Sequence, residues 1–214
     1  MDTNPSAPSP ATTSSPVPSA GPDPGRPGGV GLLGTVVRRW PLVAGVALGG
    51  FQIALDDPHD VSGVLMVLLL ATTGYVVVAA LVRPGWSWPV VGALTVLVVG
   101  SRLAGAPPTG VLVGLLLLCA AAVLVGAVQG TWSRQDLYRW QPWSAAAFLG
   151  VSFAALAFDP DLGRVVVAVG LIGHTVWDVV HWRRHEVVSR SLAEWCAGLD
   201  LTLGVGVLLV PLWM

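Results

Sequence analysis

The sequence predicts an all-α fold, a polytopic bundle of seven transmembrane helices with the N-terminus in the cytoplasm and the C-terminus outside. Of the 214 residues, 54% are hydrophobic and 11% are charged, whereas a soluble domain carries about 25% charged residues. The mean hydropathy is +0.73. Seven apolar segments follow one another, and arginine is concentrated in alternate connections between them. The chain is therefore expected in a lipid bilayer.

Charge and residue usage exclude several classes of function. The net charge of −1 argues against a nucleic-acid partner, which would require a basic face. All 11 basic residues are arginine, so a lysine Schiff base with retinal or pyridoxal phosphate is impossible. The 2 cysteines, Cys119 and Cys196, both lie in apolar segments and form no disulfide framework.

The first 29 residues differ sharply in composition from the rest. They are rich in Pro, Ser, Thr, Ala and Gly and contain almost no large apolar side chains. Such a segment buries too little surface to offset the entropy of ordering it, so residues 1–29 are predicted to be a disordered cytoplasmic tail. Residues 30–214 then form the transmembrane bundle.

The seven apolar segments differ in length. Their approximate ranges are 40–55, 61–82, 88–103, 109–129, 142–158, 162–182 and 192–213. A helix needs about 20 residues to cross the hydrocarbon core, with a range near 17–25. The second, fourth, sixth and seventh segments meet this length. The other three are short, and whether they span fully is left open.

Arginine and tryptophan predict the orientation. With the N-terminus inside, nine arginines fall in cytoplasmic regions and two, Arg102 and Arg164, in outer loops. Cytoplasmic loops are enriched in arginine, so the distribution supports this direction and an odd number of crossings. Eight of the 10 tryptophans also lie near the predicted cytoplasmic ends. A multi-pass protein of the bacterial inner (plasma) membrane is expected.

Small residues at helical spacing mark places where helices can approach closely. The pairs Gly45/Gly49, Gly110/Gly114 and Gly126/Gly130 each have three residues between them. None of them implies an oligomer, so the oligomeric state stays undetermined.

Ionisable residues inside the last two segments are the candidate functional residues. His174, Asp178 and His181 are spaced i, i+4 and i+7, which puts them on one face of a helix. Charged groups at membrane depth are costly and therefore face other helices or a watery cleft. Arg183 and Arg184 follow directly, so the site is expected to open toward the cytoplasm.

The final segment returns antiparallel after a short basic loop, and it carries Glu194, Cys196 and Asp200. Residues equally far from the turn lie at similar depth in an antiparallel pair. This matching predicts three level pairs, which are His174 with Asp200, Asp178 with Cys196, and His181 with Glu194. Glu194 lies about 120° around the helix from Asp200, so it is equally suited to the interface beside Arg190.

Three interpretations of this polar site stay open, and with them the question of whether the protein is an enzyme. The site can be structural, with His–carboxylate pairs holding the last two helices together. It can belong to a metal-dependent enzyme of the hydrolase type that acts on a lipid-phase substrate. It can also belong to a proton- or ion-coupled transporter, which would need a continuous polar route to the outer face.

For the metal interpretation, the candidate ligands are His174, Asp178, His181 and Asp200, with Cys196 as a further donor. Imidazole and carboxylate ligands suit Zn, Fe or Mn. His174 and Asp178 are the better-spaced pair, because histidines seven residues apart are separated by about 10 Å along the helix axis.

The motif His174-x-x-x-Asp178-x-x-His181, followed by Cys196 and Asp200, resembles a pattern in small multi-pass bacterial membrane proteins. Their last two helices carry a similar H-x-x-x-D-x-x-H motif and a downstream Cys/Asp pair. The high Ala, Val, Gly and Arg content without Lys is similar to that of actinobacterial proteins. The resemblance covers about the C-terminal fifth of the chain and implies no assigned activity.

Overall fold

The computed structural model describes residue 34, residues 37–55 and residues 62–209 of the chain. The described part contains seven α-helices and three short 3-10 helices and no β-strand, so the predicted fold class is confirmed. The predicted tail, residues 1–29, lies outside the described residues. The α-helices are α2 (Trp40–Leu55), α3 (Ser62–Leu81), α4 (Ser87–Leu103), α5 (Pro108–Val128), α6 (Gln141–Ala157), α7 (Pro160–Arg184) and α8 (Arg190–Leu209). The 3-10 helices are η1 (Pro84–Trp86), η2 (Thr131–Ser133) and η3 (Leu137–Trp140).

Within the described residues, five helices are long and apolar enough to cross a membrane, which indicates a membrane protein. They are Ser62–Leu81, Pro84–Leu103, Pro108–Val128, Pro160–Arg184 and Arg190–Leu209. The third predicted segment, 88–103, gains length because η1 leads directly into α4 and the two together make 20 residues. By contrast, α2 has 16 residues and α6 has 17, so these two helices remain as short as their sequences indicated.

Local sequence explains how α7, which carries most of the candidate residues, begins and ends. Asp159 caps its first turn by accepting a hydrogen bond from Leu162 N at 3.1 Å, as expected for an Asp before a proline. At the other end His185 adopts a left-handed conformation with φ 56° and donates its N–H to His181 O. This places the two histidines and the aspartate in the second half of a 25-residue helix.

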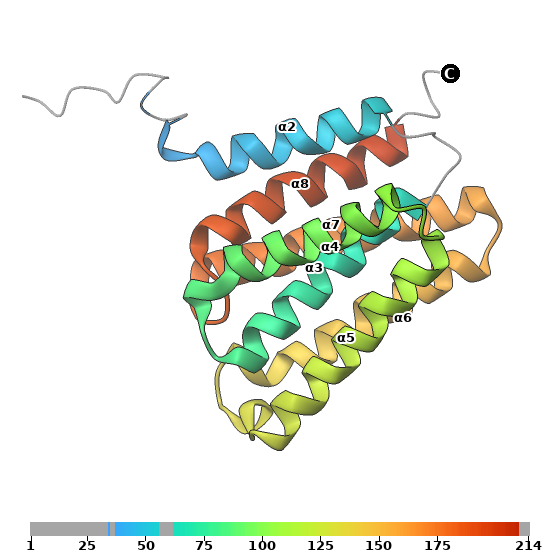
Figure 1. Ribbon diagram of the computed structural model, residues 1–214. Coiled ribbons are helices and arrows are strands. Elements are labelled where there is room, and N and C mark those ends of the chain that lie inside the picture. Colours follow the sequence, from blue (N-terminus) through green and yellow to red (C-terminus); the bar gives the residue numbers. More distant parts are fainter. Residues whose placement is uncertain (1–33, 35–36, 56–61, 210–214) are drawn as a thin grey trace, which may run out of the picture.

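The central helix of the bundle is α3. Within its most apolar 18 residues 78% are buried, against 22% in the span that contains α4. Figure 1 shows α2 lying along α8 on one side of the bundle and α5 and α6 on the other. The most extensive helix pairs are α2 with α8 and α7 with α8. The last two helices are therefore packed between α2 and the rest of the bundle.

Glycines explain why α2 packs so closely on α8. A Cβ atom on Gly45 would overlap the carbonyl oxygen of Trp195, and one on Gly198 would lie 2.7 Å from Leu42 O. A Cβ on Gly49 would also meet α8, 2.9 Å from Thr202 Cβ. The predicted close contact at Gly45 and Gly49 is confirmed.

The other two glycine pairs do not mediate contact between helices, so that expectation was wrong. A Cβ on Gly114 would meet no described atom within 4 Å, and one on Gly110 would touch Pro107 alone. Gly126 instead makes room for the indole of Trp132 in η2. Gly130 adopts φ 71° in the turn after α5, a conformation that glycine reaches without strain.

The connections α3–α4, α5–α6 and α7–α8 meet at one end of the bundle and bond to each other. Ser87 Oγ accepts from Ser189 N at 2.8 Å, and Glu186 Oε2 accepts from Leu137 N at 2.8 Å. Tyr138 donates its hydroxyl to Glu186 O at 3.0 Å, and burial raises the pKa of this phenol. The tyrosine therefore stays a neutral donor that ties η3 to the α7–α8 connection.

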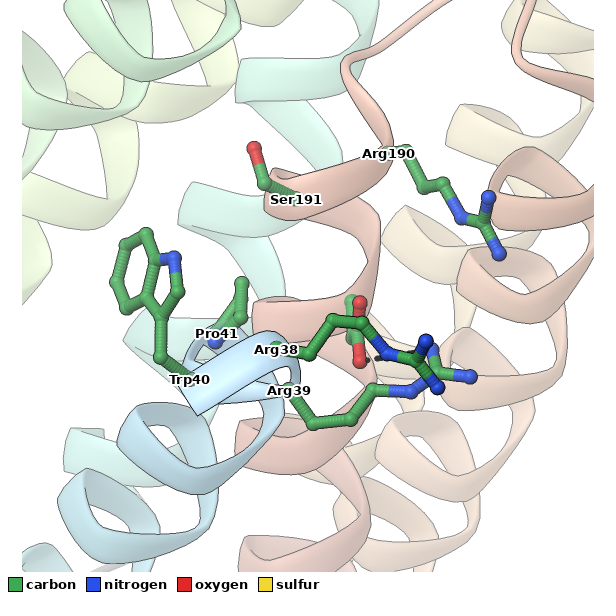
Figure 2. A pocket seen from close by; sticks show the side chains of 7 residues that line it. Arg38, Arg39, Trp40, Pro41, Arg190 and Ser191 are labelled. Carbon is green, nitrogen blue, oxygen red and sulfur yellow. Dashed lines mark hydrogen bonds and ion pairs between the residues drawn. The ribbon is translucent and has the colours of Figure 1, made fainter. Parts of the chain in front are cut away.

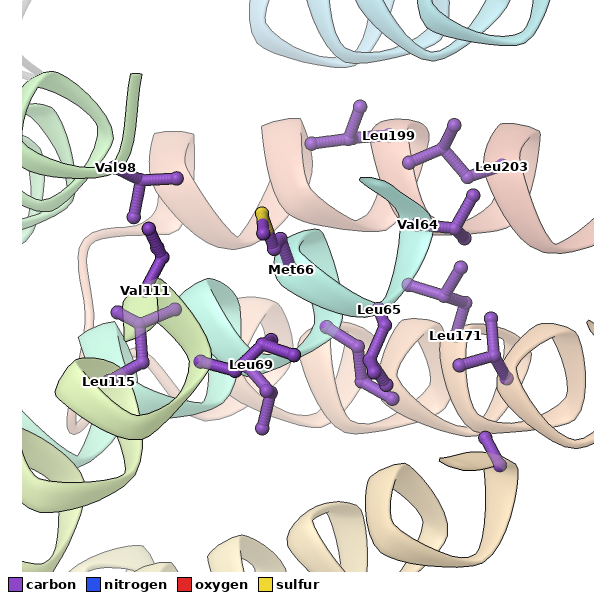
Figure 3. Close-up of a cluster of buried hydrophobic side chains, with 14 residues drawn as sticks. Val64, Leu65, Met66, Leu69, Val98, Val111, Leu115, Leu171, Leu199 and Leu203 are labelled. Atoms are coloured by element: carbon purple, nitrogen blue, oxygen red, sulfur yellow. The ribbon is translucent and has the colours of Figure 1, made fainter. Parts of the chain in front are cut away.

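The other half of the bundle is filled by apolar side chains. Figure 3 shows this cluster, in which leucines and valines of α3, α5, α7 and α8 meet. Its fully buried members include Leu65, Leu68, Leu171 and Leu203. The polar residues of α7 thus lie next to a dry hydrophobic core, which makes their mutual hydrogen bonds energetically important.

Candidate functional site

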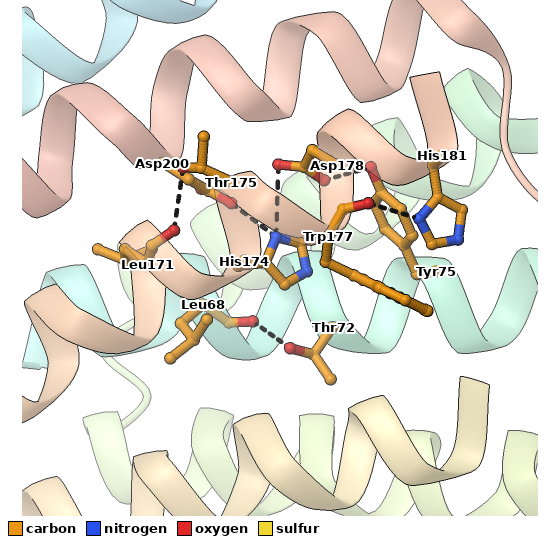
Figure 4. A network of polar contacts seen from close by, with 10 residues as sticks. All are labelled: Leu68, Thr72, Tyr75, Leu171, His174, Thr175, Trp177, Asp178, His181 and Asp200. Atoms are coloured by element: carbon orange, nitrogen blue, oxygen red, sulfur yellow. Dashed lines mark hydrogen bonds and ion pairs between the residues drawn. The ribbon is translucent and has the colours of Figure 1, made fainter. Parts of the chain in front are cut away.

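Four ionisable residues of the last two helices are buried together in the structure. His174, Asp178 and Asp200 are each 0% exposed, as is His181 further along α7. Figure 4 shows His174 and Asp178 on one face of α7 with Asp200 approaching from α8. Helical spacing accounts for this arrangement on α7, and antiparallel packing of α8 supplies the second carboxylate.

One imidazole nitrogen faces both carboxylates. His174 Nδ1 lies 2.8 Å from Asp200 Oδ2, a hydrogen bond across the two helices, and 3.5 Å from Asp178 Oδ2. His174 and Asp200, which were predicted to lie at the same depth, are therefore joined by a direct hydrogen bond. With Nδ1–H as the donor, the imidazole links the two helices near the middle of the bundle.

Tyr75 on α3 belongs to the same cluster and was missed by the sequence analysis. Its hydroxyl donates to Asp178 Oδ1 at 2.5 Å, and its ring packs edge-on against His174 and His181, at 5.3 Å and 4.8 Å between centroids. The signal was present but weak, because a lone tyrosine in an apolar helix usually only packs. Tyr75 both orients Asp178 and separates the two histidines.

His181 has a different set of partners from His174. Its Nδ1 lies 2.9 Å from Trp177 O and its Nε2 lies 2.7 Å from Gln141 Nε2. Since Nδ1–H donates to the carbonyl, Nε2 is the acceptor and the glutamine amide is the donor. Gln141, at the start of α6, was the second residue that sequence reasoning missed, because a single glutamine beside tryptophans is typical of a membrane interface.

Glu194 lies outside the cluster, whereas Cys196 packs with Tyr75 in one buried group but is not one of the three clustered donor residues. Glu194 Oε1 accepts from Arg39 Nη1 at 3.0 Å, so this carboxylate bonds to the residue before α2 and not to His181. Cys196 is buried and lines a groove next to Asp200. The polar site predicted from sequence therefore divides into a central cluster, a His181–Gln141 pair and an Arg39–Glu194 pair.

The central cluster has the donor atoms that a metal ion requires. One ligand atom each from His174, Asp178 and Asp200 lie within 4.8 Å of one another. Asp178 Oδ2 and Asp200 Oδ1 are buried and accept no hydrogen bond within the described residues. Two carboxylates and one imidazole suit Zn, Fe or Mn, and the double negative charge matches a divalent ion. His181 is not part of this donor group.

An apolar groove reaches the cluster from the side of the bundle. It has a volume of about 440 Å³ and runs between α2, α3, α4 and α8. Its walls are mostly apolar side chains such as Leu48, Val67 and Val98, and Asp200 and Cys196 lie among its lining residues. Arg102, near the end of α4, lines the same groove. The wall of the groove thus includes one of the three donor residues, whose carboxylate is buried behind the groove surface.

No known family model matches this chain, no curated protein is similar to it in sequence, and no solved structure is similar to it in fold. The geometry of the cluster and the groove therefore carries the functional argument.

Proposed function

We propose that the chain is a metal-dependent enzyme of the hydrolase type in the bacterial inner membrane, acting on a lipid-phase substrate. The observation that carries this proposal is the group of three donor atoms from His174, Asp178 and Asp200, within 4.8 Å of one another and fully buried. Ionisable groups at such a depth are costly to keep and are a common mark of function.

Charge balance supports a bound divalent ion. Two carboxylates share one imidazole donor, and each keeps one oxygen without a hydrogen bond within the described part of the chain. An excess of negative charge in a low-dielectric interior is unfavourable, and a divalent cation removes it while engaging the free oxygens. Zinc, iron or manganese fits this ligand set.

Each residue of the cluster then has a defined task. His174, Asp178 and Asp200 would hold the ion, with the imidazole binding through a ring nitrogen that carries no proton, and the ion would supply Lewis-acid polarisation of a carbonyl or phosphoryl oxygen and activation of water. Tyr75 holds Asp178 through its 2.5 Å bond to Oδ1, so that Oδ2 stays directed at the other ligands. The apolar packing around the cluster keeps bulk water away and strengthens these electrostatic interactions.

The groove between α2 and α4 supports a substrate that comes from the lipid phase. Its walls are apolar and Asp200 is among its lining residues, so a lipid in the groove would lie next to the buried carboxylate and would reach it after a small movement of the surrounding side chains. Ligand sites are typically apolar clefts of about 300–1,000 Å³ with few polar groups, and the volume of about 440 Å³ lies in that range.

The orientation remains part of the proposal. Arg38, Arg39, Arg83 and Arg190 lie at the end of the bundle where α2 and α8 begin, whereas Arg102 and Arg164 lie toward the other end. The excess of arginine supports a cytoplasmic location for the first end, with the N-terminus inside and the C-terminus outside.

The direct bond between His174 and Asp200 supports a second role, the fastening of α7 to α8. Fastening the helices needs only His174 and Asp200, whereas metal binding also needs Asp178 as a third donor. Ion transport is less well supported, because the buried leucines Leu171 and Leu203 belong to an apolar core beside the cluster. A proton or ion route to the far end of the bundle would have to cross that core.

Metal analysis of the purified full-length protein tests the proposal. The protein is equilibrated with Zn²⁺, Mn²⁺ or Fe²⁺, washed, and analysed by inductively coupled plasma mass spectrometry. We expect stoichiometric metal in the wild type and its loss in Asp200→Asn and His174→Ala. The matched control is His181→Gln, which removes a buried histidine from the same helix outside the donor group. Metal-free wild type, or equal loss in the control, would contradict the proposal.

Hydrolysis is then measured in detergent micelles with a panel of fluorogenic acyl esters, acyl amides and phosphodiesters. Activity should depend on the added metal, disappear with chelator and be absent in Asp200→Asn. Metal binding without any turnover over the panel would reject the hydrolase assignment and leave a metal site.

A further inference from the structure

A second cavity lies at the end of the bundle where α2 and α8 begin. It has a volume of about 690 Å³. Figure 2 shows its lining, which consists of Arg38, Arg39, Trp40, Pro41, Arg190, Ser191 and Glu194. Glu194 precedes Asp200 by six residues, about 9 Å along the helix axis. The cavity is therefore separate from the cluster of His174, Asp178 and Asp200, and it shares no lining residue with the apolar groove.

The lining of this cavity carries an excess of positive charge. Three arginines face one glutamate, and the bond between Arg39 and Glu194 at 3.0 Å neutralises a single pair. Arg38 and Arg190 remain as two uncompensated cations among the lining residues. Guanidinium groups match the oxygens of a phosphate with two parallel hydrogen bonds, so this charge pattern favours a phosphate ligand.

Stacking holds two of the guanidinium groups in place. The guanidinium carbon of Arg190 lies 4.1 Å from the ring centroid of Trp182, and that of Arg39 lies 5.3 Å from the same ring. Cation–π contacts of this kind reduce the freedom of long side chains. Arg190 and Arg39 are thus arranged before any ligand arrives, which lowers the entropic cost of binding for these two side chains.

Tryptophans place the cavity at the depth of the lipid headgroups. Trp40 stacks on Trp88 with 6.0 Å between ring centroids, and Trp88 contacts Trp195 at 5.7 Å. Trp88 Nε1 donates to Ser191 Oγ at 2.9 Å. Indole rings concentrate at the membrane–water interface, where their apolar body meets lipid and their N–H meets polar groups. The arginines of the cavity consequently lie at the level of lipid phosphates.

Helix direction adds to the same preference. The helices α2 and α8 both begin at this cavity, and α8 has 20 residues. The dipole of a helix favours an anion at its start, although Ser189 already accepts hydrogen bonds from Leu192 N and Ala193 N in the first turn of α8. This contribution reinforces the charge of Arg190, which opens α8.

From these observations we infer that the cavity binds a phosphate group, supplied either by an anionic phospholipid headgroup or by a soluble phosphate ester. Arg38 and Arg190 contact the phosphate oxygens, Arg39 stays paired with Glu194, and Ser191 lies beside the ligand. Trp40 packs against the glycerol or acyl part. The bound phosphate would bridge the starts of α2 and α8.

Native mass spectrometry of the full-length protein tests this inference. The protein is extracted from nanodiscs that contain phosphatidylcholine with or without phosphatidylglycerol, in the presence of chelator so that metal binding plays no part. Retention of phosphatidylglycerol by the wild type is expected. A basic side chain near the membrane surface contributes about 1 kcal/mol, so Arg38→Gln and Arg190→Gln should each weaken retention about five-fold.

The matched control is Arg83→Gln. Arg83 lies before η1 at the same end of the bundle but does not line the cavity. Equal weakening by Arg83→Gln would show general attraction of charged lipid to a basic surface and would overturn the inference. Unchanged retention in both cavity variants would overturn it as well.

Competition identifies the source of the phosphate. Glycerol 1-phosphate and inorganic phosphate are titrated against the retained lipid at fixed ionic strength. Displacement at micromolar concentration assigns the cavity to a soluble phosphate ester, and resistance to displacement assigns it to a lipid headgroup. If neither lipid nor soluble phosphate binds, the inference fails, whatever the metal analysis gives. Failure of phosphate binding would therefore leave the metal site untouched, and the reverse also holds.

Discussion

His174 and His181 lie on the same face of α7, and both are fully buried, but they have opposite kinds of partners. His174 faces two carboxylates, with Asp200 at 2.8 Å and Asp178 at 3.5 Å. His181 faces a neutral amide and a backbone carbonyl, at 2.7 Å and 2.9 Å. The ring of Tyr75 separates the two sites. Residue type and burial are thus equal, and the two sites differ in their partners, one of which comes from α7 itself and one from a neighbouring helix in each case.

This difference shows that the partners of a buried histidine decide what the side chain can do. A histidine beside two carboxylates has the charge and the donor atoms to share a cation with them. A histidine between an amide and a carbonyl is already satisfied as a neutral ring. One site therefore suits metal binding and the other suits structural support. Four variants test this contrast, in decreasing order of expected effect.

The largest effect is expected at the His174–Asp200 bond. His174→Ala leaves two buried carboxylates without their shared donor, so the free energy of unfolding should fall by about 3–5 kcal/mol. The double variant with Asp200→Ala should lose less than the sum of the single variants, with a coupling of about 0.5–3 kcal/mol. Unfolding in mixed dodecyl maltoside and SDS with chelator, followed by circular dichroism, measures these values. Additive effects would argue against the direct bond.

Tyr75→Phe should have the second largest effect. It keeps the ring between the histidines but removes the hydroxyl that donates to Asp178, and a hydrogen bond to a charged group contributes about 1.5–3 kcal/mol. Tyr138→Phe is the matched control, because its hydroxyl donates to a neutral carbonyl and contributes about 0.5–1.5 kcal/mol. The same unfolding measurement compares the two variants. Equal losses of unfolding free energy would show that the bond to Asp178 is no stronger than a bond to a neutral carbonyl. Metal affinity should also fall in Tyr75→Phe and stay unchanged in Tyr138→Phe.

Gln141→Leu probes the neutral site. It removes the donor to His181 Nε2, and an interhelical hydrogen bond in a membrane contributes about 0.6 kcal/mol on average. The expected loss in unfolding free energy is therefore about 1 kcal/mol when the unpaired nitrogen is included. Bound metal, measured by mass spectrometry, should not change. A loss of metal here would mean that the two histidines act together after all.

The smallest effect is expected for Glu194→Gln, which removes the charge that pairs with Arg39. The side chain of Arg39 is 40% exposed, so solvent and salt screen this pair. Exposed ion pairs contribute about 0.2–1 kcal/mol, and the loss should shrink further as salt is added. Stability measured at low and high salt checks this. A salt-independent loss as large as that of Tyr75→Phe would place Glu194 with the buried cluster.

Much of the fold followed from composition and periodicity. Seven apolar segments predicted seven helices, because a backbone in lipid must satisfy its own hydrogen bonds and helices do so within one segment. Gly45 and Gly49 were predicted to allow close packing and do contact α8. The failures at Gly110 and Gly126 have a simple cause, since glycine spacing does not reveal whether a neighbouring helix or a local tryptophan fills the space.

The site could be predicted from the sequence only in part. Equal distance from the α7–α8 turn correctly paired His174 with Asp200, since two consecutive antiparallel helices keep depth in register. The same reasoning paired His181 with Glu194, yet each bonds elsewhere. Depth along a helix is predictable from residue number, but rotation about its axis and the positions of α2 and α6 are not.

For this chain, the arrangement of apolar segments determines the helices. The spacing of the ionisable residues determines that His174 and Asp200 lie at one depth and that Asp178 lies one turn away on the same inward face of its helix. Both follow from local geometry and from the cost of placing charge in lipid. Packing of non-consecutive helices decided the rest. It brought Tyr75 of α3 onto Asp178, Gln141 of α6 onto His181 and Arg39 onto Glu194. Contacts between distant segments depend on how whole helices fit together, and no local pattern encodes that fit.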